Sequence, residues 1–261
     1  MDIYSILEKV RSKKPLIHHL TNWVTIYDCA NIVKVFGASP VMAHAKEEVS
    51  DMVKLASSLV LNIGTLTPDF IEAMILAGKG ANKKGIPIIL DVCGAGATSL
   101  RNGKCKKLIK ELKIGIIKGN ASEIANIAGE NIQTKGVDSS KVEKDLVELA
   151  KSLAKKEKNV VVITGEEDIV SDGENTYIIK NGCEVMSHIV GTGCMAASVI
   201  GTFAAVEKDL AKASVAGLVC YEIAAELACK ESSGPGTFKE KLFDNIFRLN
   251  KENIEKMKKI S

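Results

Sequence analysis

Residues 59–92 read LVLNIGTLTPDFIEAMILAGKGANKKGIPIILDV, in which two apolar runs flank an amphipathic segment. The runs at 59–63 and 86–92 are almost continuously apolar, as is typical of strands that are buried on both faces. Between them, the threonine and proline at 67–68 are typical of a helix start, and Gly85 is typical of a helix end. The stretch therefore predicts a strand, a helix and a second, parallel strand.

The same order of strand and helix extends along the chain. Further apolar runs predict strands at 16–20, 114–118 and 159–164. Amphipathic segments predict helices at 24–36, 46–58 and 140–156, and another from Asn120. Because these strands lack polar alternation and are joined by helices, we expect a parallel sheet that is covered by helices on both faces.

The region after residue 164 has a different pattern. Turn sequences at 172–173 and 181–182 flank the short runs IVSD, TYII and CEVM, which predicts hairpins. Later segments predict helices at 194–206, 209–230 and 237–258. Since no repeat, low-complexity segment or linker marks a boundary, we expect one α/β domain over residues 1–261, with a mostly parallel sheet, a hairpin section and C-terminal helices.

The composition argues against several classes of function. Lysine and arginine total 35 against 32 acidic residues, and the small excess is spread along the chain. Only 4% of residues are aromatic, which is too few for a surface that stacks on nucleic-acid bases. No apolar run is long enough to cross a membrane, and the charged N-terminus does not resemble a signal peptide. We expect a cytoplasmic protein with no nucleic-acid or membrane partner.

The seven cysteines agree with a reducing compartment. Their number is odd, and no C-x-x-C pair occurs. Most of them lie in apolar segments, so we expect most of the thiols to be buried as small hydrophobic groups.

Polar residues follow several predicted strands. Asn62 and Asp91 end two strands, and the segments 118–120 and 191–194 are expected at the same edge of the sheet, where open parallel sheets bind their ligands. Asp91 precedes the glycine loop 94–98. A carboxylate beside such a loop suits a Mg²⁺ ion that bridges nucleotide oxygens. The alternative is that Asp91 caps its own loop.

Asn120 and Glu123 have two interpretations. Their spacing is that of a capping box, in which the asparagine caps a helix and the glutamate reaches back to the cap N–H. Glu123 also follows a strand at the same edge as Asp91, so a metal ion or its water shell could use it. The spacing alone does not decide between the two.

The segment SHIVGTGC at 187–194 predicts a strand, a sharp glycine turn and a helix N-terminus. The first N–H groups of a helix attract phosphate or a developing oxyanion. Cys194 would lie beside that partial positive charge, which lowers the pKa of a thiol and makes it more reactive. The alternative is that a small residue merely fits a tight turn.

Two common nucleotide motifs do not explain this segment. No G-x-x-x-x-G-K-[ST] sequence occurs, which excludes a kinase of the P-loop type. The residues GTGCMA fit the G-x-G-x-x-A pattern of dinucleotide-binding proteins. That pattern also requires a second strand with an acidic residue, whereas Glu207 and Asp209 fall between two predicted helices.

From about Pro15 to Phe238, the chain resembles the hydroxyethylthiazole kinase family of the ribokinase-like superfamily. The blocks that carry the resemblance are TN at 21–22, GASPVMAHAKEEVSDM at 37–52, LVLNIGTLT at 59–67, ILD at 89–91, GAGAT at 94–98, KGNASEI at 118–124, ITGEEDIVSDG at 163–173 and GTGC at 191–194. The resemblance implies a ribokinase-like three-layer α/β/α fold. It also implies ATP-dependent phosphorylation of the hydroxyl of 4-methyl-5-(2-hydroxyethyl)thiazole in thiamine biosynthesis and salvage.

The resemblance further implies roles for individual residues. Met42 would line the thiazole pocket, and Gly191 would lie beside the substrate hydroxyl. The ATP contacts would be Lys118, Asn120 and Thr164, and the Mg²⁺ site would use Asp91 and Glu123. Gly191, Gly193 and Cys194 would form the catalytic turn, with Cys194 at the position where most ribokinase-like enzymes have an aspartate base. Members of the family are trimers, so a homotrimer with active sites between subunits is implied.

Three other functions are possible for a chain of this kind, and several residues differ from the family pattern. Hydroxymethylpyrimidine kinases share the fold and can carry GTGC, whereas dehydratases of hydrated nicotinamide nucleotides typically have an aspartate in that turn. A nucleotide-sensing module without enzymatic activity is a third alternative. Lys118 replaces a common arginine, Val92 and Cys93 replace a common Pro-Val pair before the glycine loop, and Trp23 and Tyr27 lie in a stretch where asparagine is frequent. We expect these departures to change affinity and specificity more than the reaction.

Overall fold

The computed structural model describes residues 1–130 and 139–261. In these residues one sheet has eight strands in the order β2-β1-β3-β4-β5-β6-β7-β8. Pairing is parallel from β2 to β6 and antiparallel from β6 to β8, which confirms both the parallel sheet and the hairpin section. The strands are β1 (Leu16–Leu20), β2 (Ser39–Val41), β3 (Ser58–Asn62), β4 (Ile88–Asp91), β5 (Ile116–Asn120), β6 (Val160–Thr164), β7 (Asp168–Ser171) and β8 (Thr176–Ile179).

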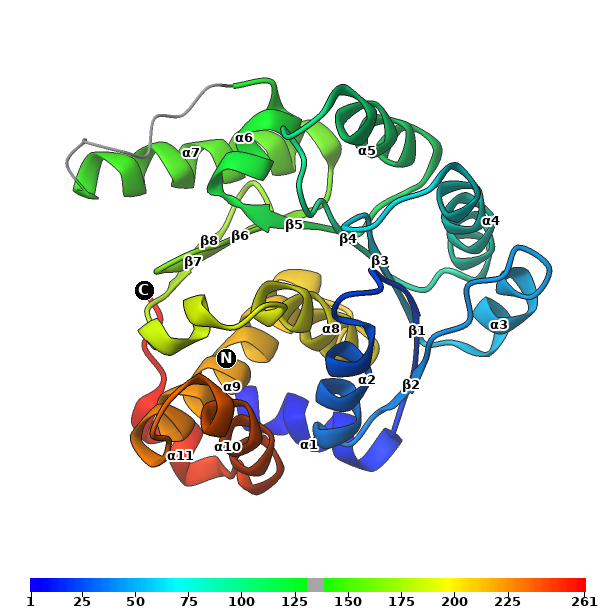
Figure 1. Ribbon diagram of the computed structural model, residues 1–261. Helices are drawn as coiled ribbons and strands as arrows, with labels where there is room; N and C mark the ends of the chain where they lie inside the picture. Colours follow the sequence, from blue (N-terminus) through cyan, green and yellow to red (C-terminus); the bar gives the residue numbers. More distant parts are fainter. Residues whose placement is uncertain (131–138) are drawn as a thin grey trace.

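Helices cover both faces of the sheet, so the expected three-layer α/β/α arrangement is confirmed. In Figure 1 the sheet is a curved band, with α3 to α7 along its outer side and α1, α2 and α8 to α11 on its inner side. The helices are α1 (Ile3–Lys13), α2 (Ile26–Val35), α3 (Val49–Leu55), α4 (Pro68–Lys84), α5 (Ser99–Glu111), α6 (Ala121–Ala128), α7 (Ser139–Glu157), α8 (Thr192–Ala204), α9 (Leu210–Glu231), α10 (Pro235–Arg248) and α11 (Lys251–Met257), with a 3₁₀ helix, η1, at Glu184–His188.

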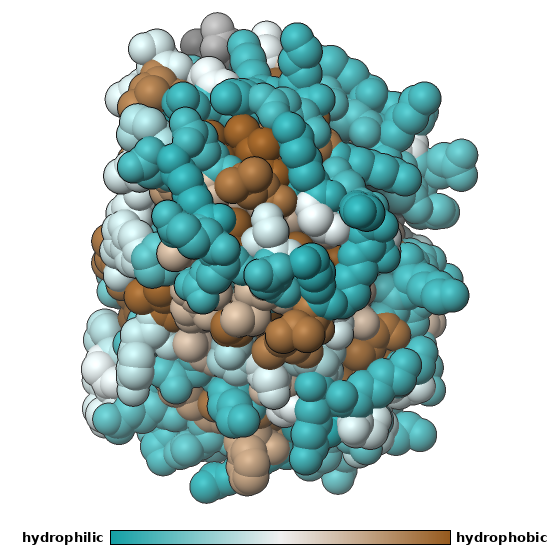
Figure 2. Space-filling model, turned by 90° about the vertical axis from the view of Figure 1, so that its right-hand side faces the viewer, coloured by the Kyte–Doolittle hydropathy of each residue, from teal (hydrophilic) through white to brown (hydrophobic). Residues whose placement is uncertain are grey.

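The predicted caps explain where several helices begin and end. The side chain of Thr67 accepts a hydrogen bond from Phe70 N at the start of α4, and Gly85 ends α4 in the left-handed conformation at φ 78°. Asn120 caps α6 as expected. On the face shown in Figure 2, which includes α3 and α4, hydrophobic residues lie in small patches among hydrophilic ones. In the described part of the chain, no helix combines the length and the apolar character that crossing a membrane requires.

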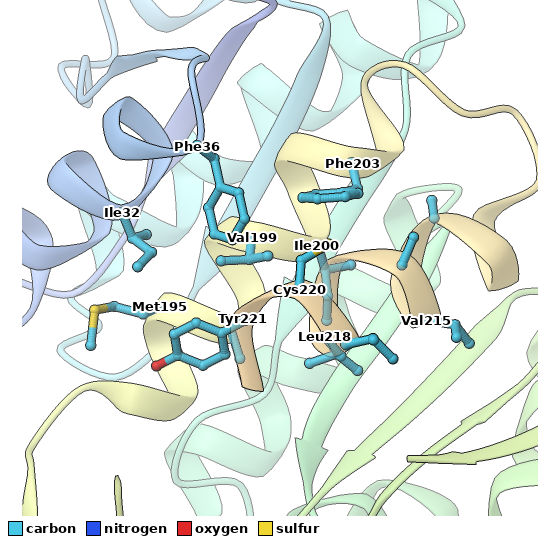
Figure 3. Packing of buried hydrophobic residues seen from close by; sticks show 14 of the residues in the cluster. Ile32, Phe36, Met195, Val199, Ile200, Phe203, Val215, Leu218, Cys220 and Tyr221 are labelled. Carbon is cyan, nitrogen blue, oxygen red and sulfur yellow. The ribbon is translucent and has the colours of Figure 1, made fainter. Parts of the chain in front are cut away.

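Helix α8 packs closely against the sheet and thereby places its N-terminus. A Cβ atom on Gly201 would lie 2.4 Å from a methyl group of Val60, so only glycine permits this approach. Figure 3 shows the aromatic rings that fill the space between α2, α8 and α9. Phe36 and Phe203 meet edge to face with ring centroids 5.5 Å apart. This packing directs the first turn of α8 toward the carboxyl ends of the central strands.

The hairpin prediction is wrong for CEVM, and no strand precedes the glycine turn. Most of CEVM belongs to η1, and His188 ends that 3₁₀ helix. The edge of β8 that CEVM would have joined is instead occupied by the C-terminus of the chain. Ile178 and Ser261 exchange two backbone hydrogen bonds of 2.9 and 3.0 Å, and Ile179 forms a bridge with Ile260. A distant segment therefore takes the pairing partner that the local sequence suggested.

Three other expectations need correction. The predicted helix at 237–258 is divided into α10 and α11, because Asn250 adopts an extended conformation and caps α11 through its side chain. The helix expected at 46–58 is shorter, and α1 and β2 were not predicted. Three of the seven cysteines are buried and the other four are partly exposed. The prediction that most thiols are buried is therefore wrong, and one of the partly exposed thiols belongs to Cys194.

Candidate active site

Three polar side chains stand in a row at the carboxyl ends of neighbouring strands. Asn62 on β3 pairs in register with Asp91 on β4, which pairs with Lys118 on β5, so all three side chains lie on one face of the sheet. They are almost completely buried, with exposed fractions of 1%, 1% and 4%. Asn62 Nδ2 donates a 2.8 Å hydrogen bond to Asp91 Oδ2, and Lys118 Nζ lies 3.6 Å from the same oxygen. An amide, a carboxylate and an ammonium group are thus held together away from water.

The second oxygen of Asp91 is free. Oδ1 is buried and has no hydrogen-bond partner among the described residues. Burial raises the pKa of Asp91 to about 7; the charges of Cys194 and Glu123 add to the rise, and Lys118 and Asn62 oppose it. Asp91 does not act as a loop cap, because its side-chain hydrogen bond goes to Asn62. Its free oxygen is available to a ligand that carries positive charge.

Lys118 stays charged although it is buried. Burial by itself would lower the pKa of its ammonium group. Asp91 and the other nearby anionic groups outweigh this effect, so the pKa of Lys118 is raised. A buried cation therefore lies inside the carboxyl edge of the sheet, 3.6 Å from Asp91 Oδ2.

The first turn of α8 faces this cation and has no cap of its own. Gly191 precedes the helix with φ 99° and makes no side-chain cap. Its carbonyl accepts the first helical hydrogen bond from Met195 N over 2.8 Å. A Cβ atom on Gly193 would lie 3.2 Å from Lys118 Nζ, so the ammonium group lies directly against the turn. Uncapped N–H groups and a buried cation together form an anion-binding position.

Cys194 lies in the same turn, and its sulfur faces hydrogen-bond donors. Asn22 Nδ2 donates to Cys194 Sγ over 3.2 Å, and Asn62 Nδ2 lies 3.4 Å from the same atom. A hydrogen bond from the Cys93 thiol lowers the pKa of Cys194 most strongly, burial opposes it, and Thr25 also lowers the pKa. The thiol of Cys194 is therefore the more acidic member of the pair. The expectation of a lowered pKa is confirmed in direction. The groups that lower it are neighbouring side chains, those of Cys93, Thr25, Lys118 and Asn22, and not the helix N-terminus on which the expectation rested.

Glu123 forms the predicted capping box and a further contact. Its Oε2 accepts a 2.7 Å hydrogen bond from Asn120 N, and Asn120 Oδ1 accepts one of 2.9 Å from Glu123 N. Its Oε1 accepts a 2.7 Å hydrogen bond from Gly94 N, which ties α6 to the glycine loop after β4. The structural interpretation of Glu123 is confirmed. Each carboxylate oxygen retains a lone pair for a water molecule of a metal shell.

Arg101 on α5 holds the loops after β3 and β4 together. Its guanidinium donates to the carbonyl oxygens of Ile63, Cys93 and Gly64 over 2.9, 3.1 and 2.7 Å. These loops follow Asn62 and Asp91, so Arg101 fixes the backbone on both sides of the row of polar side chains. Sequence reasoning missed this role because the contacts are to backbone atoms 8 to 38 residues away.

Two further predicted residues, Thr164 and Met42, also lie at the carboxyl edge of the sheet. Thr164 ends β6 in register with Asn120, and its hydroxyl lies 3.5 Å from the carbonyl oxygen of Gly119. Two of the three predicted ATP contacts, Asn120 and Thr164, are therefore neighbours. Met42 follows β2, the edge strand, and is half-buried.

A buried pair of acids lies behind the loop that follows Thr164. Asp168 on β7 accepts a 3.0 Å hydrogen bond from Gly165 N. Glu222 on α9 lies near enough to Asp168 for the two groups to shift each other's pKa, and its buried Oε2 has no hydrogen-bond partner in the described structure. Burial raises the pKa of both groups, and the Asp168 charge adds to the rise at Glu222. The pair therefore favours binding a proton.

Comparison with known proteins identifies the family. A family model described as the hydroxyethylthiazole kinase family matches residues 7–252. The chain belongs to this family. It is 53% identical over 254 residues to "Hydroxyethylthiazole kinase" of Methanosarcina mazei, and the match covers 97% of each chain. The family expected from the sequence and the expected kinase class are confirmed.

Solved structures agree with this result. A hydroxyethylthiazole kinase protein from Pyrococcus horikoshii OT3 superimposes with a TM-score of 0.92 at 38% identity, covering 99% of this chain and 98% of that one. A ribokinase-like superfamily protein from Enterococcus faecalis has a TM-score of 0.68 at 11% identity over 94% of each chain. The second likeness shows the fold alone and confirms that it is ribokinase-like. Family membership also favours the thiazole kinase over the pyrimidine kinase and the dehydratase.

Proposed function

We propose that this member of the hydroxyethylthiazole kinase family transfers the γ-phosphoryl group of ATP to the primary hydroxyl of 4-methyl-5-(2-hydroxyethyl)thiazole. We assign the position of the reaction from one observation: the N-terminus of α8 is uncapped, and Lys118 lies against it. Phosphoryl transfer passes through a loose transition state whose charge lies on three equatorial oxygens. Donors and cations that are already in place stabilise this charge without reorganisation.

The residues at this position would divide the work of the transfer. The turn from Gly191 to Cys194 would receive the transferred phosphoryl group, and Lys118 would balance its charge. Gly191 would lie beside the substrate hydroxyl, and Cys194 Sγ would accept the hydroxyl proton. Cys194 must be a thiolate to accept this proton, and it becomes a neutral thiol when the transfer is complete. A late proton transfer requires only a weak base. Asn120 and Thr164 would contact ATP at the neighbouring strand ends.

The residues at the carboxyl edge fit a Mg²⁺ ion. Asp91 Oδ1 is a buried acceptor without a partner, and oxygen ligands with retained waters are what Mg²⁺ prefers. No group of three or more histidine, cysteine or acidic side chains is arranged to hold a metal among the described residues, so substrate phosphates and water would complete the shell. Asp91 would hold the ion and Glu123 would contact its waters. When bound, Mg²⁺ would neutralise charge on the ATP phosphates.

We also propose that the protein is a homotrimer whose active sites lie between subunits, with Met42 in the thiazole pocket. Four large apolar side chains near the glycine turn are exposed: Trp23 by 47%, Val24 by 68%, Tyr27 by 74% and Val190 by 74%. An apolar surface beside a reacting position is well suited to a subunit contact. Free thiols throughout the chain agree with a cytoplasmic location.

The activity is tested by ADP release from Mg-ATP with the thiazole, with hydroxymethylpyrimidine and without an acceptor. We expect stimulation by the thiazole. Stimulation by the pyrimidine alone would mean that the substrate pocket is assigned wrongly. Nucleotide binding by folded protein without turnover on either alcohol would favour the sensing module.

The oligomeric state is tested by light scattering coupled to gel filtration, with Tyr27→Glu as the disrupting variant and Lys104→Glu on α5 as a control. We expect a trimer for the parent chain and the control, and a smaller species with reduced activity for Tyr27→Glu. A monomeric parent chain with full activity would contradict active sites between subunits.

A further inference from the structure

Asn62 contacts both Asp91, the proposed Mg²⁺ ligand, and Cys194, the proposed base. Its Nδ2 donates to Asp91 Oδ2 over 2.8 Å and lies 3.4 Å from Cys194 Sγ. Its Oδ1 accepts from Asn22 Nδ2 over 3.0 Å and from Gly64 N over 2.8 Å. We infer that Asn62 is a positioning residue for phosphoryl transfer, which holds Asp91 with one oxygen free and, with Asn22, keeps N–H donors on Cys194. This inference rests on the proposed function.

The orientation of both amides is fixed by their surroundings. A backbone N–H can only donate, so the contact with Gly64 N identifies the acceptor side of Asn62. Asn22 Oδ1 likewise accepts from Thr25 N over 3.1 Å and from the Thr25 hydroxyl over 3.0 Å. The NH₂ group of each asparagine must therefore point toward the site. Flipping either amide would place its NH₂ group against a backbone N–H and its oxygen against another oxygen, that of Asp91 for Asn62 and that of Asn62 for Asn22.

The first consequence concerns Asp91. Asn62 and Lys118 approach the same oxygen, Oδ2, from the two neighbouring strands. This arrangement fixes the rotation of the carboxylate and leaves Oδ1 without a partner in the described structure. Groups that orient a ligating side chain from behind are commonly as important as the ligand for its affinity and activity. Without Asn62, the carboxylate would be free to rotate and direct either oxygen toward Lys118.

The second consequence concerns Cys194. Two N–H groups, from Asn22 and Asn62, approach its sulfur, so Sγ accepts hydrogen bonds at the point where the substrate hydroxyl would arrive. Removing the Asn62 side chain also removes the acceptor that anchors Asn22 Nδ2. Loss of one residue would therefore loosen both donors. A sulfur that faces fewer donors has less thiolate character and reacts more slowly with alkylating reagents.

The test compares Asn62→Leu and Asn62→Asp with the control Asn82→Leu. Asn82 also makes two side-chain hydrogen bonds, to the backbone N–H and carbonyl of Lys113, at the opposite end of the sheet. Both Asn62 variants should lower kcat by about 10- to 100-fold with KM values for ATP and thiazole close to those of the parent chain. In metal-free protein, iodoacetamide should modify the Cys194 peptide about threefold more slowly, as measured by mass spectrometry. Asn82→Leu should change neither quantity.

Different failures of this test have different meanings. A folded Asn62→Asp variant with the parent kcat and the parent rate of Cys194 modification would overturn the inference. A parent chain without thiazole-dependent turnover would overturn the proposed function instead, and the modification rates would still decide whether Asn62 acts on Cys194. Slower modification in both Asn62 variants, but not in Asn82→Leu, would support that action, and equal rates in all variants would overturn it.

Discussion

Helices α6 and α8 begin at the same edge of the sheet and treat their first N–H groups in opposite ways. Asn120 and Glu123 close the start of α6 with a reciprocal capping box. Gly191 leaves the start of α8 without a side-chain cap, and Lys118 Nζ lies against the turn. Both helix N-termini carry the same partial positive charge. Capping therefore decides which of two similar helix ends remains available to a phosphate.

The two ends also differ in what lies beneath them. The carboxylate of Glu123 contributes negative charge to α6 and ties it to the glycine loop. The turn of α8 lies over the row formed by Asn62, Asp91 and Lys118, which contains a buried cation and a carboxylate with a raised pKa. Substitutions at α8 should therefore affect catalysis, whereas matched changes at α6 should mainly affect stability.

The largest effect is expected from Gly191→Ala. At φ 99° a Cβ atom would lie 2.7 Å from a methyl group of Thr25, so the turn must move. We expect kcat/KM to fall by more than about 100-fold, as when an oriented oxyanion donor is lost. The matched control is Gly129→Ala at the end of α6, where φ is 83° and the added Cβ meets nothing within 4 Å. Gly129→Ala should lose about 1–2 kcal/mol of unfolding free energy from its left-handed backbone alone. Gly191→Ala should lose at least as much, and equal activities of the two variants would contradict the comparison.

The next largest effect is expected at Cys194. Cys194→Ala should lower kcat by about 10- to 100-fold and leave ATP binding intact, because the sulfur acts on the acceptor hydroxyl and not on the nucleotide. Cys194→Asp should remain active, since a carboxylate can accept the same proton. The measurements are steady-state kinetics and calorimetric titration with a nucleotide. A folded Cys194→Asp variant that is inactive would contradict the assignment of Cys194 to the base position.

A smaller effect should separate the two roles of Glu123. Glu123→Gln and Asn120→Ala each break the capping box, and each should cost about 1 kcal/mol of unfolding free energy. Glu123→Gln should raise the Mg²⁺ concentration for half-maximal turnover several-fold, because it removes a carboxylate from the proposed water shell. Asn120→Ala should raise it less. Equal Mg²⁺ requirements in the two variants would reduce Glu123 to a structural residue.

The smallest effect concerns the buried acids Asp168 on β7 and Glu222 on α9. Burial, and then the Asp168 charge, raise the pKa of Glu222 well above its ordinary value, so the folded chain binds a proton that the unfolded chain releases. Stability from this group is present below the ordinary pKa and is lost as the pH rises toward the folded pKa. As the pH is raised from 5 to 8, the free energy of unfolding measured in urea titrations should therefore fall less for Glu222→Gln than for the parent chain. A parallel pH dependence would show that Glu222 binds no such proton.

Local sequence was sufficient for most elements of the fold. The apolar runs at 59–63 and 86–92 predicted β3 and β4, because strands buried on both faces need no polar alternation. The cap residues Thr67 and Asn120 predicted where α4 and α6 begin. CEVM was placed wrongly, since its pairing edge is taken by residues 259–261 from the far end of the chain.

For the site, the sequence by itself determined the types of residue, their place after the strands and the family to which they belong. It left open whether Glu123 caps a helix, and it gave no role to Asn22 or Arg101. Only the tertiary structure brought Asn62, Asp91 and Lys118 into one register and placed the turn of α8 over them. The physical reason is that hydrogen bonds and buried charges depend on distances of about 3 Å between segments far apart in the chain, and these distances are fixed by how the layers pack.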